Sequence, residues 1–100
     1  MKEIMIDASK LTYLENSPVF SYILEFIKNL DNDYLDNIYS NIIENIPSEK
    51  LEYVFDVITK TYYYISFLIN SNEPDICSFK VIKYYISNGK ILLKIKLKEL

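Results

Sequence analysis

The fold is decided by residues 78–98, SFKVIKYYISNGKILLKIKLK. Its second half alternates between two sets of side chains, Ile91, Leu93, Ile95 and Leu97 in one set and Leu92, Lys94, Lys96 and Lys98 in the other. A period of two is typical of a half-buried strand. Asn88-Gly89 precedes this run, and both residues tolerate the positive φ that a two-residue hairpin turn requires. The pattern predicts an antiparallel hairpin that pairs residues 78–87 with 90–98.

A two-residue turn also predicts the register of the hairpin. One face then carries the pairs Ile86 with Ile91, Tyr84 with Leu93, Ile82 with Ile95, and Lys80 with Leu97. The other face carries Phe79, Val81, Lys83 and Tyr85 opposite Lys98, Lys96, Lys94 and Leu92. A three-residue turn would mix lysines into the apolar face, so the two-residue register is favoured. In it, Lys83 faces Lys94, a like-charge pair that is mildly destabilising.

Three segments before the hairpin have the period of a helix. They are residues 18–30, which follow the N-cap signal Ser17-Pro18, residues 33–46, and residues 48–70. The third segment is apolar on two sides, which predicts a central position. The sequence therefore predicts an α+β fold: three helices with a long central third helix, then a C-terminal β-hairpin, with a third strand from residues 3–7. A chain of 100 residues suits a single domain, 1–100.

The composition argues against an enzyme. The chain has no histidine and no arginine, so it lacks the usual neutral-pH acid–base group and the planar cation that binds phosphate or guanine in a bidentate manner. Cys77 is the only cysteine, which excludes an internal disulfide and a cysteine–histidine zinc site. Asp31-Asn32-Asp33 fails as a calcium loop because Leu35 and Asp36 follow. No catalytic residue, cofactor or metal site is predicted.

No export signal or membrane-spanning stretch is expected. The first residues carry acids where a secretory signal would be basic and apolar, and the longest uncharged stretch, 61–72, is too short for a bilayer. We expect a cytoplasmic protein without membrane association, in the host cytoplasm if the protein is viral. The abundance of Lys, Asn, Ile and Tyr without Arg is typical of an AT-rich coding sequence.

Charge is sorted along the chain. Residues 1–77 carry five lysines and thirteen carboxylate side chains, whereas residues 78–100 carry six lysines and only Glu99. The basic part predicts an anion-binding or nucleic-acid-binding ribbon, made of Lys83, Lys94, Lys96 and Lys98 with the aromatic residues Phe79 and Tyr85. The alternative is that these lysines keep a short sheet soluble and prevent edge-to-edge pairing.

The acidic part predicts a partner-binding face on the helices, made of Asp31, Asp33, Asp36, Glu49, Glu52 and Asp56. Such a face can dock on a basic groove of another protein, because long-range attraction speeds the encounter. The alternative is that these acids only complement helix N-termini, with Asp56 and Lys60 forming an ordinary supporting pair.

Two functions follow. The first is a small non-enzymatic interaction module that occupies a protein partner's basic surface; in size and charge the chain is similar to phage- or plasmid-type inhibitors and immunity proteins. The second is a nucleic-acid-binding regulator, because the order of elements over residues 17–98 resembles a winged-helix domain, in which a helix reads DNA and the hairpin is the wing. The helix in the recognition position departs from that pattern, with Glu49, Glu52 and Asp56 against Lys50 and Lys60. Self-association through the bipolar charge is a further alternative.

Overall fold

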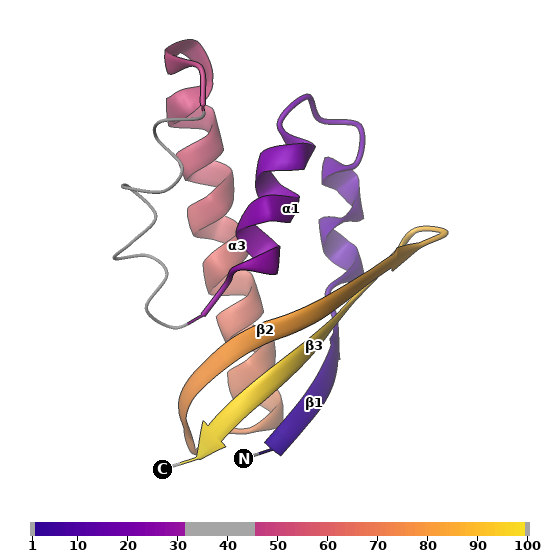
Figure 1. Cartoon of the computed structure of the whole chain (residues 1–100), viewed down its shortest axis with the longest axis vertical. Coiled ribbons are helices and arrows are strands. Elements are labelled where there is room, and N and C mark those ends of the chain that lie inside the picture. Colours follow the sequence, from indigo (N-terminus) through magenta and orange to yellow (C-terminus); the bar gives the residue numbers. More distant parts are fainter. Residues whose placement is uncertain (1, 32–45, 100) are drawn as a thin grey trace.

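A computed structural model describes residues 2–31 and 46–99 (Figure 1). The elements in chain order are β1 (Lys2–Asp7), η1 (Ser9–Leu14), α1 (Phe20–Lys28), η3 (Ser48–Lys50), α3 (Leu51–Asn72), β2 (Ile76–Ser87) and β3 (Lys90–Glu99). The mixed α+β fold, the long helix before the hairpin and the third strand at the N-terminus are confirmed. The helix expected at 33–46 lies outside the described residues.

The three strands form one antiparallel sheet in the order β1-β3-β2. β1 pairs with β3 from Lys2 opposite Leu97 to Asp7 opposite Leu92. Asn88 and Gly89 form the predicted turn, with φ values of 46° and 75°. The consequence for function is that β3, the most lysine-rich strand, lies in the centre of the sheet and not at an edge.

The hairpin register agrees with the prediction near the turn and differs beyond it. Lys83 pairs with Lys94 as expected, but a register shift between Val81 and Lys83 leaves Ile82 as an extra residue, and Val81 takes its place opposite Ile95. The predicted pairs of Ile82 with Ile95 and of Lys80 with Leu97 are therefore wrong. A β-bulge inverts the alternation that follows it. It places Phe79 and Val81, 8% and 2% exposed, in the core and leaves Lys80 exposed, which avoids burying an ammonium group.

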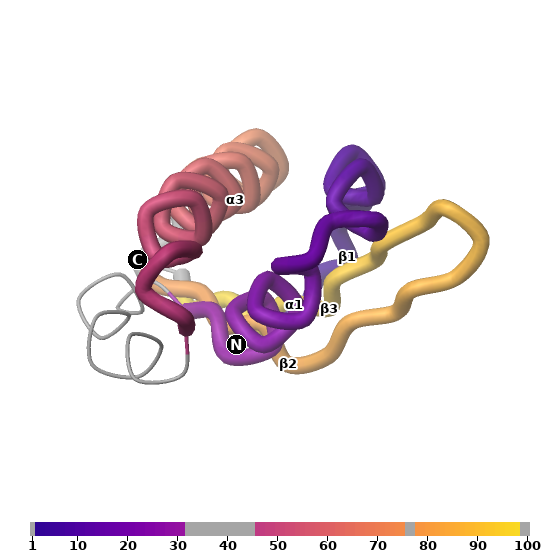
Figure 2. The backbone as a smooth tube through the Cα atoms, turned by 90° about the horizontal axis from the view of Figure 1, so that it is seen from above, coloured from indigo at the N-terminus to yellow at the C-terminus, as the bar shows by residue number. Residues whose placement is uncertain are grey.

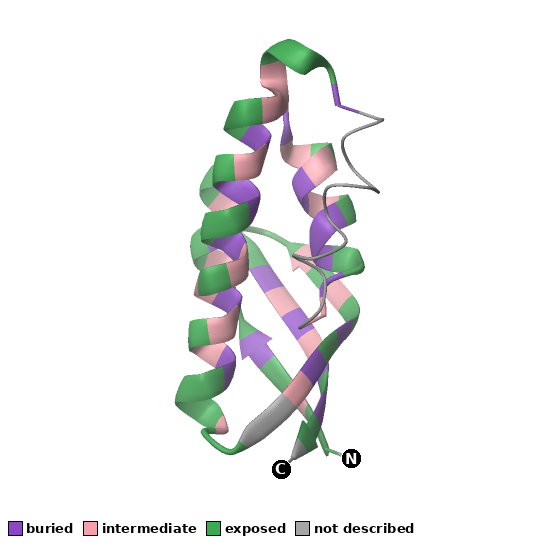
Figure 3. Cartoon of the chain, turned by 90° about the vertical axis from the view of Figure 1, so that its left-hand side faces the viewer, coloured by how far each residue is buried: buried purple, intermediate pink, exposed green. Residues whose placement is uncertain are grey.

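The core lies on one face of the sheet. α1 packs between α3 and β2, and η1 packs against β3 (Figure 2). α3 lies on the same side of the sheet, where the centre of the Tyr62 ring is 6.3 Å from the centre of the Phe79 ring of β2. The buried positions alternate along β3 and recur every three or four residues along α3 (Figure 3). The largest buried side chains come mostly from α1, α3 and β3, with one from η1 and one just after α1: Leu14, Ile23, Phe26, Ile27, Leu30, Ile58, Ile65, Ile69, Ile91, Leu93 and Ile95. In the described part of the chain, no helix combines the length and apolarity needed to cross a membrane.

Candidate functional site

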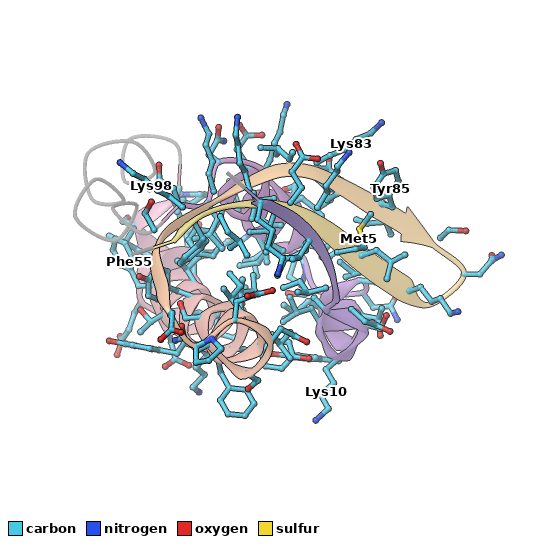
Figure 4. All side chains as sticks on the ribbon, turned by 90° about the horizontal axis from the view of Figure 1, so that it is seen from below. Met5, Lys10, Phe55, Lys83, Tyr85 and Lys98 are labelled. Carbon is cyan, nitrogen blue, oxygen red and sulfur yellow. The ribbon has the colours of Figure 1, made fainter. Side chains whose placement is uncertain are left out.

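Five lysines share the outer face of the sheet, the side turned away from α3. The lysine face consists of Lys80 and Lys83 on β2 and Lys94, Lys96 and Lys98 on β3. Figure 4 shows Lys83, Tyr85 and Lys98 on this side of the molecule and Lys10 on the opposite side. The burial pattern explains this orientation, because the side chains that alternate with the β3 lysines are buried in the core.

The carboxylates of the described residues neutralise little of this charge. Glu3 of β1 reaches Lys94, with 3.5 Å between Oε2 and Nζ, and both side chains are partly exposed. The ammonium group of Lys83 lies 5.1 Å from the centre of the Tyr85 ring. Lys80, Lys96 and Lys98 form no ion pair with any described residue. Most of the positive charge on this face is thus available to an external anion.

Two pairs of these lysines face each other directly across the hairpin. Lys83 lies opposite Lys94, and Lys80 lies opposite Lys96. Directly opposed like charges destabilise a sheet. Edge protection can explain lysines on β2 but not those on β3, since both edges of β3 are paired. The lysines of β3 therefore lower the stability of the sheet without protecting an edge.

The structure changes the membership of the predicted basic site. Tyr85 is 40% exposed on the lysine face as expected, but Phe79 is in the core, so the expectation that Phe79 offers an aromatic surface there is wrong. Lys80, expected on the other face, is a member of the lysine face. The bulge at Ile82 accounts for both differences, because it moves residues 78–81 to the opposite face.

A depression lies at the end of the sheet farthest from the hairpin turn. It has a volume of about 350 Å³ and is lined by Asp31, Ser78, Phe79, Lys80, Lys96, Leu97 and Lys98. Because the side chains of Phe79 and Leu97 are buried, these residues form the floor between the surrounding lysines. Asp31 borders it at the outer edge of β2, where the Val81 N–H donates to the Leu30 carbonyl oxygen at 2.8 Å and the backbone of Asp31 forms a β-bridge with Lys80.

The predicted acidic face is not brought together in the described residues. Asp31 lies beside β2, whereas Glu49 of η3 and Glu52 and Asp56 of α3 lie at the other end of the molecule (Figure 1). Asp33 and Asp36 lie outside the described residues. Glu49, Glu52 and Asp56 border a shallow site of about 500 Å³ with Tyr53. Asp56 is already paired with Lys60, with 2.9 Å between Oδ2 and Nζ.

The outward side of α3 also exposes large aromatic side chains. Tyr53, Tyr63 and Phe67 are 51%, 63% and 66% exposed. Tyr63 and Phe67 are one helical turn apart and therefore adjoin. With the acids at its start, this side of α3 is the second candidate site of the molecule.

Local contacts and burial shift the pKa values of three side chains. Burial raises the pKa of the half-buried Tyr64, the hydrogen bond with Asp56 raises the pKa of Lys60, and hydrogen bonds from Ser9 lower the pKa of Asp7. These contacts stabilise local structure. Within residues 2–31 and 46–99, no three potential metal-ligating side chains gather in one place. The chemistry that the lysine face offers is electrostatic binding of anions.

Comparisons with protein-family models, with curated proteins and with solved structures give no match for this chain.

Proposed function

We propose that the protein binds nucleic acid, mainly through its phosphates, on the lysine face of the sheet. The observation that carries the proposal is the direct opposition of two lysine pairs, Lys83 with Lys94 and Lys80 with Lys96, on an outer face where, within the described part of the chain, one carboxylate pairs with one of the five lysines. An anion laid across this face would relieve both repulsions. Association would then gain the Coulomb attraction and also remove an existing unfavourable interaction.

The spacing of the lysines favours a chain of repeated anions. Alternate residues of a strand are separated by about 6.7 Å, so Lys94, Lys96 and Lys98 form a row of evenly spaced cations. A nucleic-acid strand presents phosphates at regular intervals. Tyr85 adds an exposed ring at the end of the row nearest the turn, and base–aromatic stacking is the common complement to such a row in single-strand binders.

The same geometry argues for binding without base-specific readout. All cationic side chains of the chain are lysines, which act as point charges and do not fork onto a guanine edge. α3, the helix in the recognition position of a winged-helix arrangement, carries exposed Glu52 and Asp56 near its start, and exposed Glu49 lies just before it in η3. These carboxylates repel phosphate. The binding surface is therefore the sheet, and the expected ligand is a single strand of low sequence specificity.

Charge reversal tests the proposal. The double variant Lys94→Glu/Lys96→Glu is compared with wild type for binding of a single-stranded oligonucleotide carrying a 3′ fluorophore, by fluorescence anisotropy over a range of salt. For each lysine–phosphate ion pair that the variant removes, the slope of log Kd against log salt should decrease by about 0.7, with weaker binding throughout. Lys10→Glu, on the opposite side of the molecule, is the matched control. Equal effects of the control and the double variant would refute the proposal.

The outward side of α3 supports a second candidate, a protein-interaction module. The supporting observation is the exposure of Tyr53 among Glu49, Glu52 and Asp56, because aromatic side chains ringed by charge are typical of binding surfaces. The partner would present a basic surface. Affinity capture from the native host with and without nuclease, using wild type and Glu52→Lys/Asp56→Lys, tests this candidate. A captured protein that resists nuclease and is absent with the variant supports it; capture that nuclease abolishes, or that the variant retains, contradicts it.

A further inference from the structure

The cations of the lysine face are distributed unevenly. Near the turn, Lys94 is paired with Glu3, and Lys83 lies over the Tyr85 ring. At the other end, Lys80, Lys96 and Lys98 surround the depression described above and form no ion pair with a described residue. Among the described residues, Asp31 is the one carboxylate that lines this depression, so the described lining side chains carry a net charge of about +2.

We propose that this depression binds the terminal 5′-phosphate of a nucleic-acid strand, while the rest of the strand follows the lysine face. This inference rests on the proposed function and specifies which end of the ligand is recognised. A phosphate monoester carries a charge of about −1.5 to −2 near pH 7, whereas each internal phosphodiester carries a single negative charge. The charge of the depression matches the monoester better than the diester.

The arrangement of donors fits the three free oxygens of a monoester. Lys80 and Lys96 face each other across the two strands, and Lys98 is the next outward residue of β3. Ser78 lies opposite Lys98 on the same face, where its hydroxyl can donate a further hydrogen bond. Four donors thus converge from two strands on one depression, and an internal diester offers them only two free oxygens.

The position of the depression fits the end of a strand. It lies where the lysine row ends, at Lys98, and the row leads from there past Lys94 and Lys83 toward Tyr85. A strand whose 5′-phosphate occupies the depression therefore passes over the remaining lysines and brings its following nucleotides toward the exposed Tyr85 ring.

Two oligonucleotides of one sequence test the inference, one with a 5′-phosphate and one with a 5′-hydroxyl, both carrying a 3′ fluorophore. Wild type should bind the phosphorylated strand about fivefold more tightly, a modest factor because exposed ion pairs are individually weak. Lys80→Gln and Lys98→Gln should each reduce this preference. Lys83→Gln is the matched control: it should weaken binding of both strands equally and keep the preference. Circular dichroism of each variant verifies that it is folded.

The preference for the 5′-phosphorylated strand should also depend on pH, because the phosphate monoester itself titrates. The second pKa of a phosphate monoester is about 6, so the preference should fall between about pH 7.5 and about pH 5 as the monoester becomes singly charged. Among the described residues, the charged groups that line the depression are Lys80, Lys96, Lys98 and Asp31, and Glu3 of β1 lies opposite Lys96 in the sheet. The chain has no histidine. The 5′-hydroxyl strand should not show this change.

The outcomes separate the inference from the proposed function. Equal binding of the two oligonucleotides would overturn the 5′-phosphate site and leave the lysine face intact, whereas the absence of binding to either would overturn both. A free nucleoside 5′-monophosphate is added as a competitor. If it binds as tightly as the phosphorylated strand, the depression is a mononucleotide site, and recognition of a strand end is refuted.

Discussion

The repulsion between Lys80 and Lys96 is the physical premise of the proposed function, and it is measurable in the free protein. The two residues are directly opposed in the sheet, and both are exposed. For ammonium groups about 7 Å apart in water, Coulomb's law gives a repulsion of about 0.6 kcal/mol, within the range for cross-strand pairs. Replacing either lysine by glutamine removes the whole repulsion. The double variant should therefore gain no more stability from the loss of this repulsion than a single variant does.

A double-mutant cycle isolates this repulsion. Urea unfolding of wild type, Lys80→Gln, Lys96→Gln and the double variant at low salt should give a repulsive coupling of about 0.6 kcal/mol, and at 1 M salt, where the screening length is about 3 Å, the coupling should vanish. The cycle cancels each single variant's other effects, including any change in the attraction between Lys80 and Asp31. Lys96 combined with the distant Lys10 is the control and should show no coupling. A coupling that is zero, favourable or independent of salt would refute the reasoning.

Three further variants test other parts of the fold. Gly89→Ala should lower the free energy of unfolding by about 1 kcal/mol, measured by urea unfolding, because Gly89 has a φ of 75° while an added Cβ would meet no atom; an unchanged stability would contradict the turn. Thr61→Val should raise the free energy of unfolding by about 1 kcal/mol, since the buried Thr61 hydroxyl has no hydrogen-bond partner among the described residues. A loss of stability would indicate that the hydroxyl has a partner. Burial raises the pKa of Tyr64 above its ordinary 10.0, so folding favours the neutral phenol, and stability should fall as the pH rises past that value. Tyr64→Phe should weaken this alkaline loss, and an identical pH profile would contradict it.

The sequence predicted the structure correctly where the local preferences of the residues and the hydrophobic periodicity agree. Asn88-Gly89 and the alternation along 91–97 predicted the turn and the inward face of β3, and the apolar spacing predicted α3. The apolar centre of residues 3–7 indicated the third strand. The sequence did not specify the order of the strands in the sheet, because this order depends on packing between segments far apart in the chain. The order determines that the lysines of β3 lie on the central strand.

The candidate site was predicted less well, for two physical reasons. A bulge adds one residue without a turn signal, so strict alternation from Ile86 placed Lys80 inward and Phe79 outward, the reverse of what is observed. The adjacent apolar residues Val81 and Ile82 could have revealed it, because only a shift of frame between them keeps both Lys80 and Lys83 out of the core. The acidic face failed because Asp31 belongs to the edge of the sheet, a long-range contact that helical spacing does not contain.

The position of bound nucleic acid tests the central claim most directly. A single-stranded oligonucleotide titrated into isotopically labelled protein should shift the backbone amide NMR signals of residues 78–85 and 92–98, with little change in residues 49–56 of η3 and α3. Shifts concentrated at the start of α3, with the sheet signals unchanged, would contradict binding on the lysine face.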